Sequence, residues 1–163
     1  MPADHVDRIV AQWRRERPDL DFGPLAVVGR LFRAAALADA ALTRGLADEN
    51  LPPGWFDVLA ALRRSGAPYE LNPSELLRSM MLSSGGLTKR LDRLTNAGLI
   101  ERHPDPADRR GSLARLTPKG KALIDRTIAK HLANERRLLA ALRPAERRQL
   151  DKLLRTLLAG LSD

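Results

Sequence analysis

The spacing of the apolar residues changes near position 99, and this change limits the fold more than any other feature of the chain. From Trp55 to Asn96, apolar residues recur every three or four positions, which predicts helices. Beyond them, Leu99–His103 and Ser112–Thr117 predict two short strands joined by an eight-residue loop, Pro104–Gly111. Three helices followed by a hairpin indicate a mainly α fold with a small β-hairpin.

Local start and stop signals divide the helical stretch into its three helices. The first ends before Ser65-Gly66. The second begins at Asn72-Pro73-Ser74-Glu75, which supplies an Asn N-cap, proline at the first helical position and glutamate at the third. The third begins at Ser83 or Ser84 and ends near Gly98, a predicted left-handed C-cap. Its buried stripe is formed by Leu87, Leu91 and Leu94.

Positive charge is concentrated in one part of the chain. The 163 residues carry 28 Lys and Arg against 20 Asp and Glu, a net charge of +8. Between Arg78 and Lys121, ten basic residues stand against four acidic ones, a net of +6, and the other 119 residues carry 18 against 16. Charge that served only solubility would be spread evenly. The concentration therefore favours a polyanion as partner, because neutralised phosphates release their counterions.

The order of elements and the placement of charge together predict a winged helix-turn-helix lobe over residues 51–117. In such a lobe the second helix of the turn, here the last of the three, lies in the major groove of DNA. The hairpin lies along the DNA backbone or in the minor groove. The basic excess falls on these two elements, so we expect double-stranded DNA as the partner.

Long apolar helices are predicted at both ends of the chain. One runs from Pro24 to about Asp48, another from Thr117-Pro118 to about Leu142, and a last helix follows Arg143-Pro144. A single small lobe offers too little surface to bury them. Burial against a second copy is the simplest solution, and we expect a two-fold homodimer with residues 118–163 as its C-terminal dimerisation helices.

The third helix of the lobe presents a polar face opposite its leucines. With 100° per residue, the three leucines fall within about 60° of one another. Lys89 and Asn96 lie opposite, with Asp92 and Arg93 to either side. We expect Lys89, Arg93 and Asn96 to reach base edges, and Ser84 and Thr88 to contact phosphates near the helix start. The alternative is an ordinary solvated face.

Three further arginines have predicted roles. Arg90 falls on the flank of this helix, about 70° from the centre of the leucine stripe, and leans back toward the protein body. There it either pairs with a carboxylate or lines a crevice. Arg109 and Arg110 lie at the hairpin tip, where they suit the minor groove or phosphates, with Asp108 orienting one of them. The alternative for the tip is a flexible charged loop.

Several of these segments resemble the signature of the MarR family. They are Gly98-Leu99-Ile100-Glu101-Arg102, Asp105-Pro106-Ala107-Asp108-Arg109-Arg110 and Leu116-Thr117-Pro118-Lys119-Gly120. The resemblance extends from about Pro24 to Leu161. It implies a dimeric regulator that represses transcription from a pseudo-palindromic operator and is released by small phenolic or other anionic ligands.

A narrower resemblance begins before Pro24. The segment Trp13–Asp21 is similar to the added amino-terminal helix of the urate-responsive MarR subfamily. That resemblance implies a ligand crevice formed by Trp13, Asp57 and Arg90, with Arg102 of the first wing strand as a further member. Residues 1–50 would then hold this extra helix and the first dimerisation helix.

The chemistry of these four residues suits an anionic purine such as urate, or a related phenolic ligand. The ligand would stack on Trp13 and pair with Arg90 and Arg102. Asp57 would either accept a hydrogen bond from a ring N–H or be repelled by the anion. The alternatives are that Trp13 is a hydrophobic anchor for the extra helix and that Asp57 and Arg90 form a structural ion pair.

Other classes of function lack support in the sequence. The chain has no cysteine, and His5, His103 and His131 lie on separate elements, so we expect no metal site and no cofactor. No phosphate-binding loop or nucleophile elbow is present, so an enzyme is not expected. The apolar stretches are far shorter than the ~20 residues that span a bilayer, and Met1–Arg17 lacks a signal-peptide core, which predicts a cytoplasmic protein. The competing function is a winged-helix module that binds DNA without sequence preference, as an architectural protein, or binds other proteins.

Overall fold

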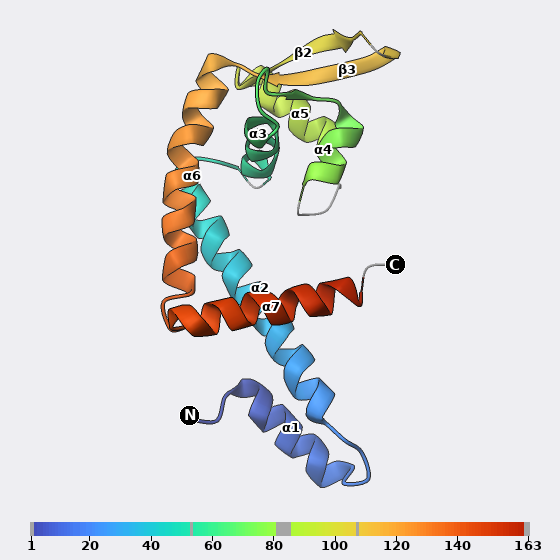
Figure 1. Cartoon of the computed structure of the whole chain (residues 1–163), viewed down its shortest axis with the longest axis vertical. Helices are drawn as coiled ribbons and strands as arrows, with labels where there is room; N and C mark the ends of the chain where they lie inside the picture. Colours follow the sequence, from blue (N-terminus) through green and yellow to red (C-terminus); the bar gives the residue numbers. More distant parts are fainter. Residues whose placement is uncertain (1, 53, 81–85, 107, 162–163) are drawn as a thin grey trace. The chain divides into compact units, whose positions relative to one another are not determined.

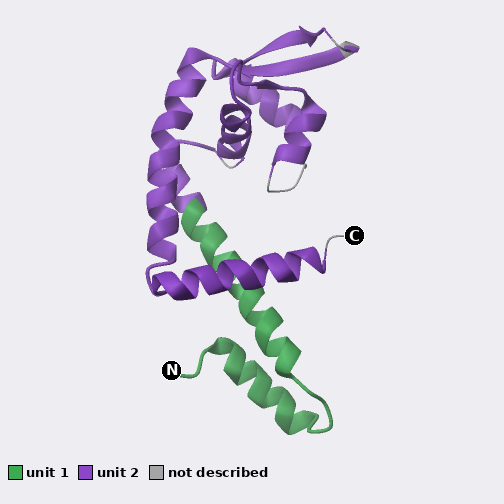
Figure 2. Cartoon of the chain, in the orientation of Figure 1, with its two compact units in different colours: residues 1–42 green, residues 43–163 purple. Residues whose placement is uncertain are grey.

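A computed structural model describes residues 2–52, 54–80, 86–106 and 108–161 of the chain. Seven helices and three strands are present in this part (Figure 1). In chain order they are α1 (His5–Glu16), α2 (Gly23–Ala47), α3 (Trp55–Arg64), β1 (Glu70–Leu71), α4 (Pro73–Ser79), α5 (Leu87–Asn96), β2 (Ile100–Asp105), β3 (Asp108–Leu116), α6 (Pro118–Leu138) and α7 (Pro144–Ala159). The chain forms two compact units, residues 1–42 and 43–163 (Figure 2).

The first unit is a helical hairpin of α1 and most of α2. Asp4 and Asp7 form a capping box at the start of α1, each accepting a hydrogen bond from the other's backbone N–H. Arg30 of α2 pairs with both carboxylates. The backbone hydrogen bonds first, and then Arg30, hold the pKa of both carboxyls below the ordinary value. Val6 and Val10 are buried, and Val6 lies against Gly29, so α1 is fixed by apolar contact as well as by charge.

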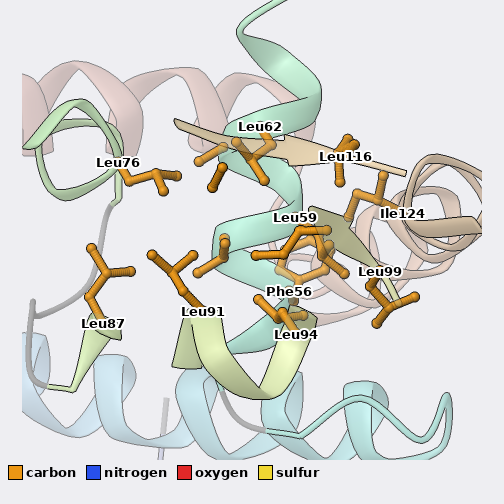
Figure 3. Close-up of a cluster of buried hydrophobic side chains, with 14 of the residues drawn as sticks. Phe56, Leu59, Leu62, Leu76, Leu87, Leu91, Leu94, Leu99, Leu116 and Ile124 are labelled. Carbon is orange, nitrogen blue, oxygen red and sulfur yellow. The ribbon is translucent and has the colours of Figure 1, made fainter. Parts of the chain in front are cut away.

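The core of the second unit is built around α3 (Figure 3). Val58, Leu59 and Leu62 of this helix have no exposed surface. α3 contacts α4, α5, α6 and β3, so it is the common support of the lobe. These elements contribute further members of the cluster, among them Leu76, Leu87, Leu91, Leu94, Leu116 and Ile124.

The wing, defined as the β2–β3 hairpin, extends further than the sequence predicted. The loop expected over Pro104–Gly111 is wrong, because β2 continues to Asp105 and β3 begins at Asp108. Proline suggested a loop, since its nitrogen cannot donate a hydrogen bond. The sheet order is β1-β3-β2, however, so Pro104 lies in an edge strand, where proline is tolerated, next to an irregularity in the register.

Most of the predicted helix boundaries are confirmed. Asn72 caps α4 in a capping box with Glu75, and Gly98 ends α5 with a φ of +67°. Ser83 and Ser84, at which α5 was predicted to start, lie outside the described residues; α5 begins later, at Leu87, because its N-cap Gly86 has a non-helical φ of +77°. α6 ends at Leu138 rather than near Leu142, because the chain there closes into tighter turns before Pro144. The sequence also gave no signal for β1, which pairs with β3 over only two residues.

The junction between the sheet and α6 depends on a glycine. Thr117 caps α6 by accepting a hydrogen bond from the backbone N–H of Gly120. A Cβ on Gly120 would lie 1.9 Å from the carbonyl oxygen of Leu99, so only glycine allows this close approach. The Thr-Pro-Lys-Gly segment therefore sets the position of α6 against Leu99, between α5 and β2.

The end helices leave apolar side chains uncovered. Neither α2 nor α7, all of whose residues the structure describes, contains a buried residue. Among the described helices, none is long and apolar enough to cross a membrane. The most exposed apolar side chains of the two helices are Val27, Phe32, Leu37, Leu153 and Leu158.

Two adjacent leucines of α4 provide a test of the core. Leu76 has no exposed surface, whereas Leu77 is 40% exposed. We expect Leu76→Ala to lower the free energy of unfolding by about 2–5 kcal/mol, because it leaves a cavity, and Leu77→Ala to lower it by about 1 kcal/mol or less. Denaturant unfolding followed by circular dichroism measures both. Equal losses would show that α4 does not pack through Leu76.

Candidate nucleic-acid interface

The packing of α5 determines which of its side chains face outward. Leu87, Leu91 and Leu94 are 6%, 2% and 0% exposed, which confirms the predicted stripe. The side chains on the opposite side are exposed and project from the lobe. They are Thr88, Lys89, Asp92, Arg93 and Asn96. Burial of the leucines therefore leaves two cations, Lys89 and Arg93, and the amide of Asn96 on the exposed face of α5.

The remaining residues predicted to contact DNA belong to segments at either side of this face. Ser84 lies outside the described residues. Arg109 and Arg110 come directly after the turn of the wing, as the second and third residues of β3. The backbone thus places both arginines near the tip of the hairpin, next to the pairing of Asp105 with Asp108.

One flank of α5 faces the start of α3. The guanidinium of Arg90 lies so close to Gly54 that a Cβ there would come within 2.4 Å of Cζ. Gly54 also has a φ of +76°, a conformation that favours glycine. Asp57 lies half-buried in the first turn of α3. The structure therefore directs Arg90 toward the body of the lobe, as predicted, and brings it to the helix that carries Asp57.

The other flank of α5 is tied to the wing. Nη1 of Arg102 in β2 lies 3.0 Å from Oδ1 of Asp92, with 35% and 53% of the two side chains exposed. This ion pair was not predicted from the sequence, where Arg102 was expected in the ligand crevice and Asp92 had no role. The sequence signal for this pair is an acidic residue on the polar side of the helix, Asp92, followed ten residues later by a basic residue of the predicted strand, Arg102.

The C-terminal end of α5 is held by side chains from the start of α6. Lys119 donates a hydrogen bond to the carbonyl oxygen of Ala97 at 2.9 Å, and Thr117 donates to that of Gly98 at 2.8 Å. A cation near the last carbonyls of a helix also interacts favourably with the helix dipole. Contacts with α3, with β2 and with the start of α6 thus fix both flanks and the C-terminal end of α5.

Trp13, the remaining predicted crevice residue, lies in the first unit. Its ring stacks on that of Phe22, with 5.9 Å between the centroids and 20° between the planes. It is 49% exposed, so much of the indole remains accessible. Within its own unit, Trp13 therefore has both an aromatic neighbour and a free surface.

The arrangement suits binding to the major groove. Arginine and lysine donate hydrogen bonds to guanine, and asparagine forms a bidentate pair with adenine. An isolated helix face with two cations also contacts phosphates readily. Among the described residues, no group of three or more His, Asp or Glu side chains is placed to bind a metal ion.

Comparisons with known proteins agree with this geometry. A model of the MarR family matches residues 49–111. The chain is 44% identical over 149 residues to the transcriptional regulator PecS of Dickeya dadantii, covering 91% of this chain and 90% of PecS. It resembles the structure of Sco3205, a MarR family regulator of Streptomyces coelicolor in complex with DNA, with 25% identity, a TM-score of 0.77 and coverage of 88% and 91%.

A second solved structure is that of Bordetella bronchiseptica BpsR. It shares 29% identity and a TM-score of 0.71 with this chain, and the match covers 80% of this chain and 91% of BpsR. The DNA binding of BpsR is regulated by 6-hydroxynicotinic acid. The comparisons thus include one protein bound to DNA and one that responds to a small aromatic acid.

Arg93 provides a test of the outward face of α5. We expect Arg93→Ala to weaken binding to the DNA upstream of the gene by about 1–3 kcal/mol and to reduce the preference over random DNA, because a base contact is lost. Fluorescence anisotropy with both duplexes measures the change. Arg148→Ala, which removes the same charge from an exposed position on α7, is the matched control. Equal losses on both duplexes would assign Arg93 to a phosphate.

Proposed function

The chain belongs to the MarR family of DNA-binding transcriptional regulators, and on this premise we propose that it is a homodimeric repressor released by a small anionic ligand such as urate. One observation carries the proposal: the buried leucines of α5 turn a face with Lys89, Arg93 and Asn96 away from the core. A helix supported in this way can enter the major groove without disturbing the lobe.

The proposed contacts divide into two kinds. Lys89, Arg93 and Asn96 read base edges, whereas Thr88 and Ser84 bind phosphates near the start of the helix. Arg109 and Arg110 contact the flanking minor groove or its phosphates. The concentration of positive charge in this part of the chain supports the assignment, because phosphate contacts supply most of the sequence-independent affinity for DNA.

The uncovered apolar side chains of α2 and α7 support the homodimer. Several large apolar side chains exposed along one helix mark an interaction surface, and a second copy of the chain would bury them. Two lobes related by a two-fold axis would then present their α5 helices to successive major grooves, about one helical turn apart. The operator would be a pseudo-palindrome, and the bound dimer would cover the promoter.

The proposed effector site consists of Trp13, Asp57 and Arg90. Arg102, the further member that the resemblance implied, pairs with Asp92 on the other flank of α5. A planar anion would stack on the indole and pair with the guanidinium of Arg90. The half-buried Asp57 and the inward direction of Arg90 support this assignment. The 44% identity to PecS and the response of BpsR to an aromatic acid also favour a ligand of this class. The ligand would lower occupancy by binding the free protein more tightly than the DNA-bound form.

Binding to the DNA upstream of the gene, compared with a random duplex of the same length, tests the proposal. We expect tighter binding to the upstream DNA and loss of this preference on addition of urate. Preference that urate leaves unchanged would retain the repressor and discard urate as its effector. Absence of preference for any genomic fragment would favour the alternative, a winged-helix module that binds DNA independently of sequence or binds another protein.

Trp13 provides a separate test of the effector site. We expect Trp13→Ala to leave the affinity for DNA within about twofold but to raise the urate concentration needed for release by about tenfold, because stacking on the indole is lost. Leu20→Ala is the matched control, since Leu20 is exposed to the same extent in the same unit. Sedimentation measures the oligomeric state. Loss of the dimer in Trp13→Ala alone would assign Trp13 to anchoring α1.

A further inference from the structure

We propose that Asp92 and Arg102 are positioning residues for DNA binding, because their ion pair fixes the wing to α5 and neutralises the one carboxylate of that helix. The inference rests on the proposed docking of α5 in the major groove. It assigns a role in DNA binding to both Asp92 and Arg102.

The geometry places the pair at the junction of the two DNA-binding elements. Asp92 and Arg90 are two residues apart, so they point about 160° from each other around α5. Arg90 is directed toward Gly54 of the lobe, whereas Asp92 is directed toward β2. β2 is an edge strand, so one of its two sides has no neighbouring strand within the sheet. The ion pair with Asp92 therefore adds a connection between the wing and α5.

The charge of Asp92 makes the pairing necessary for DNA binding. Asp92 is the single acidic residue of α5 and shares its exposed side with Lys89, Arg93 and Asn96. An unpaired carboxylate at this position would face the phosphates and repel them. With Arg102 at 3.0 Å, the two side chains present no net charge to the DNA.

The stability of the lobe does not require this pair. Both side chains are more than a third exposed, and isolated ion pairs at such positions contribute little to the free energy of unfolding. The hydrophobic cluster around α3 supplies the packing of α5 in any case. We therefore expect substitutions of the pair to change DNA binding while the midpoint of thermal unfolding stays within about 3 °C.

A double-mutant cycle tests the proposal with four proteins: the unchanged chain, Asp92→Asn, Arg102→Gln and the double variant. Affinity for a random duplex is measured by anisotropy over a range of salt concentrations. We expect Arg102→Gln to weaken binding about tenfold, because it leaves Asp92 unpaired, and Asp92→Asn alone to change binding by about threefold or less. The double variant should recover most of the lost affinity.

A neighbouring carboxylate provides the matched control. Glu101 lies next to Arg102 in β2, has a side chain 48% exposed and lies 2.9 Å from His103. Glu101→Gln removes the same charge at nearly the same place. If recovery depends on the ion pair, Glu101→Gln does not restore the affinity of Arg102→Gln, whereas Asp92→Asn does. Equal recovery by both substitutions would show a general effect of net charge and overturn the proposal.

Two further outcomes would also overturn it. If Arg102 binds a phosphate directly, the double variant stays weak and the slope of log affinity against log salt falls by about 0.9. If Asp92 reads a cytosine amino group, a separate measurement with the upstream DNA shows that Asp92→Asn loses the preference for that duplex while its affinity for random DNA is unchanged. Because the cycle uses random DNA without urate, its result does not depend on finding the operator or the effector.

Discussion

The packing of the α5 leucines against α3 is the contact on which the DNA-binding surface depends. Leu91 and Leu94 belong to the buried cluster around α3, in which Leu94 lies beside Phe56 (Figure 3). A helix has only one rotation that buries such a stripe, so burial of these side chains sets the direction of every other residue of α5. The polar face is outward because the leucines are inward.

Polar and close backbone contacts then fix the position of α5 relative to its neighbouring elements. Arg90 lies against Gly54 on one flank, and Asp92 pairs with Arg102 on the other. Gly120 allows α6 to approach the carbonyl of Leu99, which carries Lys119 to the end of α5. Each contact is small in energy compared with the core. Together they place the wing and α5 as one surface, which a rigid DNA duplex requires.

Within the second unit, the helices and strands around α3 bury their apolar side chains, whereas α7 leaves its own exposed. The lobe around α3 encloses a complete core within one chain, whereas α7 buries none of its residues. Among the described residues, the fully buried side chains lie in α3, α4, α5, β2 and α6. Ile124 and Thr127 of α6 are among them, so the N-terminal half of α6 is part of the core of the lobe.

The sequence by itself determined the helices, the buried stripe of α5 and the basic excess, because each depends on the period of apolar residues or on local charge. Asn72 and Gly98 marked boundaries for the same reason: capping requires only neighbouring residues. The tertiary structure decided the length of the wing, since Pro104 is tolerated only at a sheet edge, and sheet order is a long-range property. It also decided that Arg102 pairs with Asp92, because that contact joins a strand to a helix that only the folded core brings together.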